Sequence, residues 1–130
     1  MSYPSILIVD DEPLLVEALT FVLSREQYEI STAYDGEEAL QKISVKKPDI
    51  IFLDIMMPKK NGYQVCEIIK NTPGLKDIYI IMLSAKGWET DKAMGLSLGA
   101  NEFIAKPYSP REIVSNVKKA IEYLSLVQSG

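Results

Sequence analysis

Three carboxylates stand directly after apolar runs of strand length in this sequence. Asp10 and Asp11 follow Ile6–Val9. Asp54 follows Ile50–Leu53. Open α/β sheets place their chemistry beyond the carboxyl ends of their strands, so these acids would meet in one crevice if the two strands are neighbours. Packing does not require such a group of acids, whereas a divalent cation together with an anion would explain it, and carboxylates favour a hard ion such as Mg²⁺.

A hydroxyl and an ammonium group follow two later apolar runs in the same way. Ser84 comes directly after Ile80–Leu83, and Lys106 comes directly after Phe103–Ala105. The carboxyl ends of parallel strands open on one edge of a sheet, so these two groups should join the acids there. The following Pro107 makes a rigid link that could hold the lysine in place, and a cis peptide bond is an option before proline.

Each of these residues also has an ordinary structural interpretation when it is taken alone. Asp10 with Asp11 could cap a helix, and Asp54 could begin a turn. Ser84 could be a capping hydroxyl, and an isolated Lys106 would most often be solvated. Their common position at one predicted edge favours a functional site over five separate structural roles.

The elements that would position these residues alternate five times along the chain. Several apolar runs are nearly continuous, which is typical of strands covered on both faces. The predicted strands are Ser5–Val9, Tyr28–Ala33, Ile50–Leu53, Tyr79–Leu83 and Glu102–Ile104. Five βα units predict a doubly wound α/β fold, with a parallel sheet, right-handed crossovers and helices on both faces.

Capping residues, early prolines and a glycine stop mark five predicted helices. The first begins at Asp11 with Pro13 in its first turn, the second begins after the N-cap Asp35, the third runs from Gly62 to Lys70, the fourth runs from about Glu89 to Leu98 before Gly99, and the fifth begins after the N-cap Ser109. We expect residues 1–124 to form one domain. Residues 125–130 are expected to be a tail or the start of an interdomain linker.

Composition limits the classes of function. The 130 residues include 14 basic and 18 acidic side chains, so a net charge of −4 argues against a general nucleic-acid surface. The single Cys66 suits a reducing compartment, and the first residues lack the pattern of a signal peptide, so we expect a soluble, cytoplasmic chain without membrane contact. No histidine is present, which excludes histidine bases, histidine metal ligands and a phosphohistidine carrier.

Four motifs, in order and at compatible spacing, make the sequence resemble the receiver domain of bacterial two-component response regulators over essentially its whole length. The motifs are Ile8-Val9-Asp10-Asp11-Glu12-Pro13, then Asp54-Ile55-Met56-Met57-Pro58 with Gly62, then Leu83-Ser84-Ala85-Lys86-Gly87, then Leu98 to Pro107. The resemblance implies a flavodoxin-like (βα)5 three-layer sandwich with strand order 2-1-3-4-5.

The resemblance also implies a role for each residue at the predicted edge. Asp54 would be the phosphoacceptor, in a reaction that depends on Mg²⁺. The implied metal ligands are Asp10, Asp11, Asp54 and the backbone carbonyl of Met56. Ser84 and Lys106 would sense the phosphoryl group, Phe103 would be the switch aromatic, and Pro107 is the cis-proline candidate. Lys86, two residues after Ser84, could shield the phosphoryl group electrostatically.

The implied function is a switch in a phosphorelay. A sensor histidine kinase or a phosphotransfer protein would supply the phosphoryl group, and a downstream protein or output domain would read helix four, strand five and helix five. We expect no enzymatic turnover beyond the chain's own phosphorylation and slow dephosphorylation. Lys92 and Glu112 suit a charge pair of an active dimer, but Asn116 replaces an arginine that DNA-binding relatives commonly have, so monomer and phosphorylation-dependent dimer both stay open.

Two other classes fit the pattern less well. A hydrolase of the haloacid dehalogenase type also uses an aspartyl phosphate and Mg²⁺, but it needs an acid two residues after the nucleophile, where this chain has Met56. A flavin-binding electron carrier needs a hydroxyl- and glycine-rich phosphate loop after the first strand. Asp10-Asp11-Glu12 would repel that phosphate, so the receiver remains the favoured interpretation.

Overall fold

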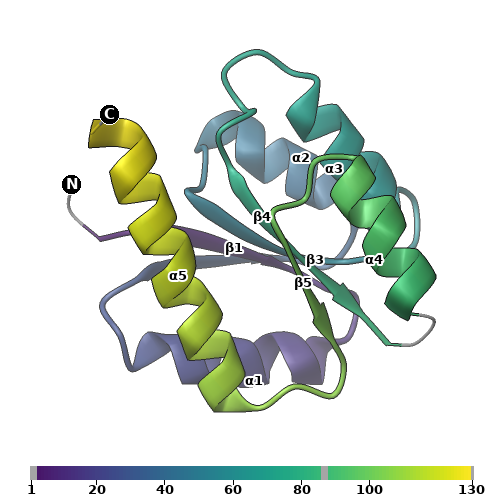
Figure 1. Ribbon diagram of the computed structural model, residues 1–130. Helices are drawn as coiled ribbons and strands as arrows, with labels where there is room; N and C mark the ends of the chain where they lie inside the picture. The colour runs from purple at the N-terminus through teal and green to yellow at the C-terminus, as the bar shows by residue number, and fades with distance from the viewer. Residues whose placement is uncertain (1–2, 86–87, 130) are drawn as a thin grey trace.

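The computed structural model describes residues 3–85 and 88–129. Five strands pair in parallel in the order β2-β1-β3-β4-β5, as predicted (Figure 1). The strands are β1 (Ser5–Val9), β2 (Glu29–Ala33), β3 (Ile50–Asp54), β4 (Tyr79–Ser84) and β5 (Glu102–Ala105). The helices are α1 (Pro13–Ser24), α2 (Gly36–Val45), α3 (Gly62–Lys70), α4 (Trp88–Ser97) and α5 (Pro110–Ser129).

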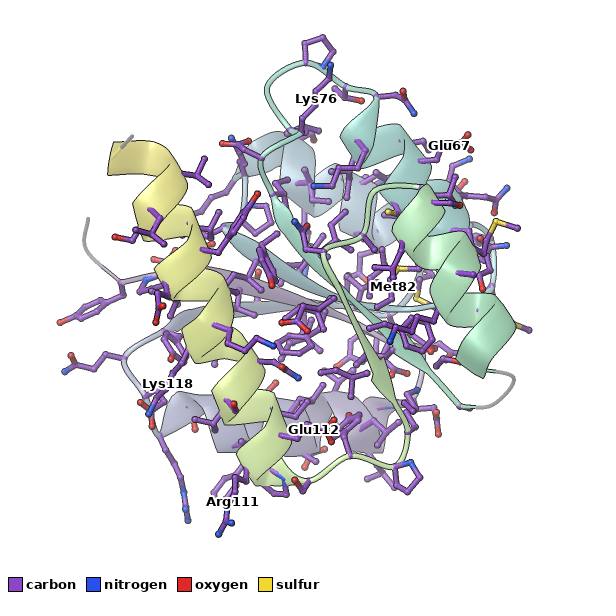
Figure 2. The ribbon with its side chains drawn as sticks, in the orientation of Figure 1. Glu67, Lys76, Met82, Arg111, Glu112 and Lys118 are labelled. Carbon is purple, nitrogen blue, oxygen red and sulfur yellow. The ribbon has the colours of Figure 1, made fainter. Side chains whose placement is uncertain are left out.

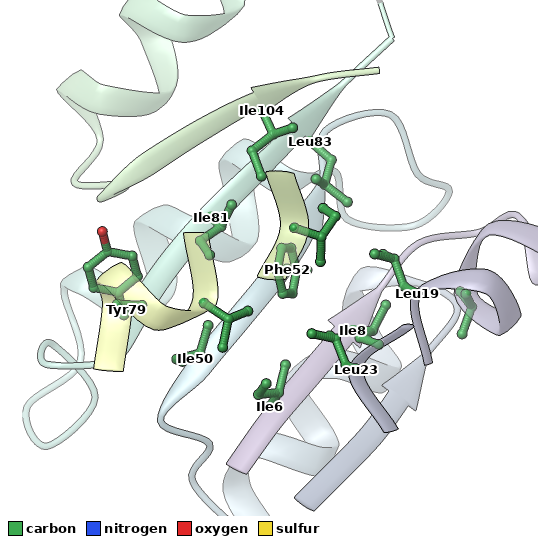
Figure 3. Close-up of a cluster of buried hydrophobic side chains, with 14 of the residues drawn as sticks. Ile6, Ile8, Leu19, Leu23, Ile50, Phe52, Tyr79, Ile81, Leu83 and Ile104 are labelled. Atoms are coloured by element: carbon green, nitrogen blue, oxygen red, sulfur yellow. The ribbon is translucent and has the colours of Figure 1, made fainter. Parts of the chain in front are cut away.

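Helices cover both faces of the sheet and divide the core in two. Successive side chains of a strand point to opposite faces, so Ile6 and Ile8 pack with α1 and α5, whereas Leu7 and Val9 pack with α2 and α3. Figure 3 shows part of the first cluster, in which Phe52 of the central strand is fully buried between β1 and β4. The sheet is therefore the middle layer of a three-layer sandwich, as expected.

Strand register brings the ends of the strands to one level. Val9 pairs with Leu53 and Leu53 with Met82, so β1, β3 and β4 end side by side. Asp54 and Ser84 lie within β3 and β4 as their last residues, one position further than the predicted ends. Asp54 and Ser84 therefore belong to the hydrogen-bonded sheet, which fixes their backbone more firmly than a loop would.

Two predicted element starts are wrong. β2 begins at Glu29 rather than Tyr28, because the Tyr28 amide instead bonds the Glu26 carbonyl at 3.0 Å, within the turn that precedes the strand. α1 begins at Pro13 after the N-cap position Glu12, so Asp11 does not cap it, and the Glu12 side chain makes no capping bond either. Proline has no N–H group, so with Pro13 at the first helical position one fewer donor needs a partner, and the helix can begin without a side-chain cap.

The N-cap residues predicted for the second and fifth helices are confirmed by side-chain capping. The Glu38 amide donates to the Asp35 carboxylate at 2.8 Å, and the Glu112 amide donates to the Ser109 hydroxyl at 3.1 Å. α5 continues to Ser129, so the segment 125–129 is helical; its role as a tail or linker stays a prediction. None of the helices in the described ranges combines the length and hydrophobicity needed to cross a membrane.

Candidate functional site

Lys106 joins two of the predicted acids at the carboxyl edge of the sheet. Its Nζ donates to Oδ2 of Asp10 at 2.9 Å and to Oδ1 of Asp54 at 3.3 Å, and it lies 3.5 Å from Oε1 of Glu12. Asp10 is fully buried and Asp54 is 4% exposed, so these charges meet largely out of water. The carboxyl ends of three strands thus each supply one member of a buried ion-pair network: Asp54 ends β3, and Asp10 and Lys106 directly follow β1 and β5.

Backbone hydrogen bonds hold each member in place. The Asp10 amide donates to the Ala33 carbonyl at 3.1 Å, and the Asp10 carboxylate accepts from the Glu12 amide at 3.0 Å. The Lys106 amide donates to the Ser84 carbonyl at 2.7 Å. The peptide bond between Lys106 and Pro107 is cis. Side-chain positions at the site therefore follow from strand pairing and short local bonds.

Gly62 lets the β3–α3 loop fold back against the phosphoacceptor candidate. A Cβ at position 62 would lie 2.4 Å from the Asp54 carbonyl oxygen and 2.9 Å from the Ile55 Cα, so only glycine fits there. The Gly62 amide also donates to the Ile55 carbonyl at 2.9 Å. Asn61 then caps α3 in a reciprocal capping box with Gln64. The close contact between Gly62 and the backbone of Asp54 and Ile55 therefore restricts the backbone at Asp54.

Burial and neighbouring charge make Asp54 a reluctant anion. The pKa of Asp54 is raised to about 6, first by burial and then by the charge of Asp10, while contact with Lys106 opposes both effects. For Lys106, burial alone would lower the pKa, but its hydrogen bond with Asp10 and the charge of Asp54 together raise it. A single ammonium thus offsets the negative charge of this site only in part.

The residues around Asp10 have the chemistry of a site for a hard cation. Carboxylate oxygens of Asp10, Asp11 and Glu12 all lie within 4.8 Å of one another, and Asp11 and Glu12 are exposed. All of these ligand atoms are oxygens, and Lys106 joins Asp10 to a further buried carboxylate, that of Asp54. The residues present therefore fit Mg²⁺. Glu12 was not among the predicted ligands, although its place after Asp10-Asp11 could have suggested it.

Ser84 reaches the predicted edge, but its hydroxyl has a partner that the sequence did not reveal. Ser84 is 2% exposed, and its Oγ donates to Oδ2 of Asp91 in α4 at 2.7 Å. The hydroxyl of Tyr63 in α3 donates to the other oxygen, Oδ1 of Asp91, at 2.9 Å. The Asp91 carboxylate therefore accepts hydrogen bonds from hydroxyl groups of two different elements, β4 and α3.

The remaining predicted residues lie around this centre. Phe103 of β5 is half-buried and packs against the second core cluster. The Met56 side chain is 75% exposed, which leaves only its backbone as a candidate ligand. Lys86 lies outside the described residues. Trp88, expected to open helix four as an exposed or half-packed residue, is the first residue of α4, and its side chain also lies outside the described part.

An open groove of about 350 Å³ adjoins Lys106. Glu12, Leu15 and Tyr108 line it together with Lys106. Within the described residues, the buried hydroxyl of Tyr108 has no hydrogen-bond partner, and burial raises the pKa of Tyr108 to about 12. A larger groove of about 780 Å³ is lined by residues of α1 and α5, none of which belongs to the site described above.

Comparison with known proteins identifies the class that this fold and site define. Residues 6–118 match the response regulator receiver domain family, so the chain belongs to that family. The alkaline phosphatase synthesis transcriptional regulatory protein PhoP of Bacillus subtilis (strain 168) is 47% identical over 113 residues, which cover 87% of this chain and 46% of PhoP. The chain thus spans about half the length of that relative.

Solved structures agree with this family. A Chloroflexus aurantiacus J-10-fl protein described as a response regulator is 38% identical with a TM-score of 0.88, and the match covers 92% of this chain and 98% of that one. The signal receiver domain of a signal transduction histidine kinase from Syntrophus aciditrophicus is 34% identical with a TM-score of 0.85, covering 92% and 90% of the two chains. The same fold therefore occurs in regulators and within kinases.

Proposed function

We propose that this receiver domain is a switch activated by phosphorylation of Asp54. The observation that carries the proposal is the buried Lys106 bridge between Asp10 and Asp54 at the carboxyl edge of the sheet. A carboxylate oxygen of Asp54 would attack the phosphorus of a phosphohistidine, forming a P–O bond as the P–N bond breaks and imidazole departs. These 130 residues contain no histidine, so the donor imidazole would lie outside them, on a sensor kinase or a phosphotransfer protein.

The residues of the site have complementary tasks in this reaction. Lys106 already contacts Asp54 and would pair with a phosphoryl oxygen as a compact cation. Asp10, Asp11, Asp54 and the Met56 backbone carbonyl would hold Mg²⁺. When bound, Mg²⁺ supplies positive charge that lets an anionic carboxylate approach an anionic donor. Because burial and Asp10 disfavour the charged form of Asp54, the acceptor depends on such compensation.

The output would be a conformational signal. A phosphoryl group adds about −1.5 to −2 charges and three strong acceptors at one point. Ser84 would donate to one of these oxygens, Phe103 would turn inward, and the α4-β5-α5 face would change for a downstream protein or output domain. We propose no turnover of an external substrate and no direct binding of nucleic acid or membrane. The cytoplasm suits this role, with the domain as a monomer or as a dimer formed on phosphorylation.

The test is to treat the protein with a small-molecule phosphoryl donor, with and without Mg²⁺, and to measure its intact mass. We expect a gain of one phosphoryl group that needs Mg²⁺ and is lost in Asp54→Asn. Asp49→Asn is the matched control, since Asp49 precedes β3 and instead accepts a bond from the Ser5 amide. No gain in the wild type, or a gain that persists in Asp54→Asn, would rule the proposal out.

A further inference from the structure

Asp91 links three elements around the hydroxyl that the switch needs. It lies in α4, accepts the Ser84 hydroxyl of β4 at 2.7 Å and accepts the Tyr63 hydroxyl of α3 at 2.9 Å. The Tyr63 hydroxyl also lies 3.4 Å from the Asp91 carbonyl oxygen. Asp91 is half-buried, so water competes with these bonds only in part. A carboxylate that accepts hydroxyls in this setting is a strong acceptor.

The Ser84 hydroxyl cannot serve two anions at once. Serine carries one O–H donor, and the described geometry gives that proton to Asp91. Asp54 pairs in register with Leu83, the residue before Ser84, so the phosphoacceptor and the hydroxyl end adjacent strands. A phosphoryl group on Asp54 would offer only acceptors to that hydroxyl. The phosphoryl group and Asp91 therefore compete for the same proton.

We infer that Asp91 is a positioning residue of the switch, because its carboxylate holds the Ser84 hydroxyl in the resting state and must release it when Asp54 is phosphorylated. This inference rests on the proposed function of Asp54. The contact sets a threshold: the phosphoryl group gains its bond with Ser84 only after the bond with Asp91 breaks. Asp91 thus opposes activation without touching the phosphoryl group.

Tyr63 keeps Asp91 in place after the release. Its ring packs against the second core cluster. Burial first and then the hydrogen bond with Asp91 raise the pKa of Tyr63 to about 12, so the phenol remains a donor at neutral pH. When the Ser84 hydroxyl is released, Asp91 therefore stays bound to Tyr63 of α3. The hydrogen bond that breaks is the one between α4 and β4.

The packing of α4 on the sheet makes this break consequential. Gly95 presents no side chain to β4, and a Cβ there would lie 3.5 Å from the Met82 Cγ. Figure 2 shows Met82 beside α4. The bond between Asp91 and Ser84 therefore ties α4 to β4 four residues before this close contact at Gly95. Phosphorylation would thus loosen α4, which belongs to the proposed output face.

The experiment measures the affinity for beryllofluoride by calorimetry at saturating Mg²⁺. Because Asp91 competes for Ser84, we expect Asp91→Ala to bind roughly three- to tenfold more tightly than the wild type. Asp91→Asn keeps the size but is a weaker acceptor, so its gain should be smaller and in the same direction. Ser97→Ala removes an exposed hydroxyl of α4 that bonds only the Met94 carbonyl in the described contacts, and it should match the wild type.

A second background separates positioning from a merely structural role. In Ser84→Ala the competition no longer exists, so adding Asp91→Ala should leave beryllofluoride affinity unchanged. The inference would be overturned if both Asp91 variants bound beryllofluoride no more tightly than the wild type. It would also be overturned if Asp91→Ala raised the affinity equally with and without Ser84. Neither result would contradict phosphorylation of Asp54. A wild type that binds no beryllofluoride, with Asp54→Asn as the blank, would overturn the proposed function and this inference together.

Discussion

At the scale of single residues, the site is built around a carboxyl group that folding makes harder to ionise. Asp54 is nearly buried beside the fully buried Asp10, and burial is the largest cause of its raised pKa. The pKa of about 6 exceeds the ordinary value of 3.8, so the folded chain holds this proton more tightly than the unfolded chain. Ionisation of such a group lowers the free energy of unfolding. The proposed phosphoacceptor must be an anion, so this loss of stability comes with the proposed function.

This cost predicts how Asp54→Asn changes stability with pH. Without metal, stability should fall as pH rises from about 4 to about 6, and the whole cost is present above pH 6. The asparagine side chain cannot ionise, so the substitution should raise the free energy of unfolding by about 1–3 kcal/mol at pH 7.5 and by almost nothing near pH 4. Urea unfolding in a chelator at several pH values measures the difference.

An exposed carboxylate provides the control for this pH dependence. Glu67 lies on the exposed side of α3, and Glu67→Gln should change the free energy of unfolding by less than about 0.5 kcal/mol at either pH. If Asp54→Asn destabilises the protein at pH 7.5, then burial does not make the Asp54 anion costly, and the contact with Lys106 dominates instead.

Residue types at strand ends revealed most of the site, but not all of it. Asp10, Asp54 and Lys106 could be predicted to meet because each follows an apolar run and parallel strands share one edge. Asp91 could not, since it lies inside a helix whose apolar pattern is weak, where an acid usually faces water. Its meeting with Tyr63 depends on how α3 and α4 pack, which no sequence spacing in this chain indicates.

At the scale of elements, every strand was predicted to within one residue at its ends, and the sequence signal differs between strands covered on both faces and strands at the edge. β3 is buried along its whole length and β4 likewise, so a continuous apolar run marked each of them. β2 lies at the edge and alternates between exposed and covered positions, and its start was misplaced by one residue. A strand buried on both faces has a continuous apolar run, which is easier to recognise in a sequence than the alternating pattern of a strand buried on one face.

The start of α3 yields a prediction about the loop that carries Asp54. Gly62→Ala places a methyl group 2.4 Å from the Asp54 carbonyl oxygen, and the neighbour is backbone that cannot rotate away. We expect the free energy of unfolding to fall by about 3 kcal/mol or more, because overpacking forces backbone shifts. We also expect slower phosphorylation of Asp54, since its backbone must move. Urea unfolding and intact mass after donor treatment measure the two effects.

Gly74 offers a matched comparison for Gly62. Its φ of +89° favours glycine, but no atom lies within 4 Å of a Cβ placed there. Gly74→Ala should therefore cost only the strain of a left-handed backbone, about 1–2 kcal/mol, and leave phosphorylation unchanged. Equal losses for the two substitutions would show that crowding against Asp54 is not what restricts position 62.

At the scale of the whole molecule, a cation at the site should stabilise the entire fold. Ligands that bind only the folded state add RT ln(1 + [L]/Kd) to its stability, about 1.4 kcal/mol at ten times Kd. Asp54 joins Asp10 and Asp11 only in the fold, so we expect the thermal midpoint to rise with Mg²⁺ concentration. Thermal unfolding followed by circular dichroism, with ionic strength held constant by NaCl, measures the rise.

Asp11 separates this specific effect from general screening. It is exposed, so Asp11→Ala should fold normally and yet lose most of the stabilisation by Mg²⁺. Lys46 and Glu29 form an exposed ion pair, and Glu29 pairs in register with Ser5 at the opposite end of β1 from Asp10, so Glu29→Gln should keep the full response. An identical rise of the midpoint in the wild type and in Asp11→Ala would contradict the proposed metal site.

The bridge between Lys106 and Asp10 spans 96 positions of the chain, which matters during synthesis. A ribosome adds about 5–20 residues per second, so Asp54 leaves it several seconds before Lys106 does. β5 is the last strand to be made and lies at the edge of the sheet, where it can be added to strands already paired. A nascent chain would therefore carry Asp54 without its counter-charge, and under the proposed function it could not be switched on before β5 and Lys106 have been translated.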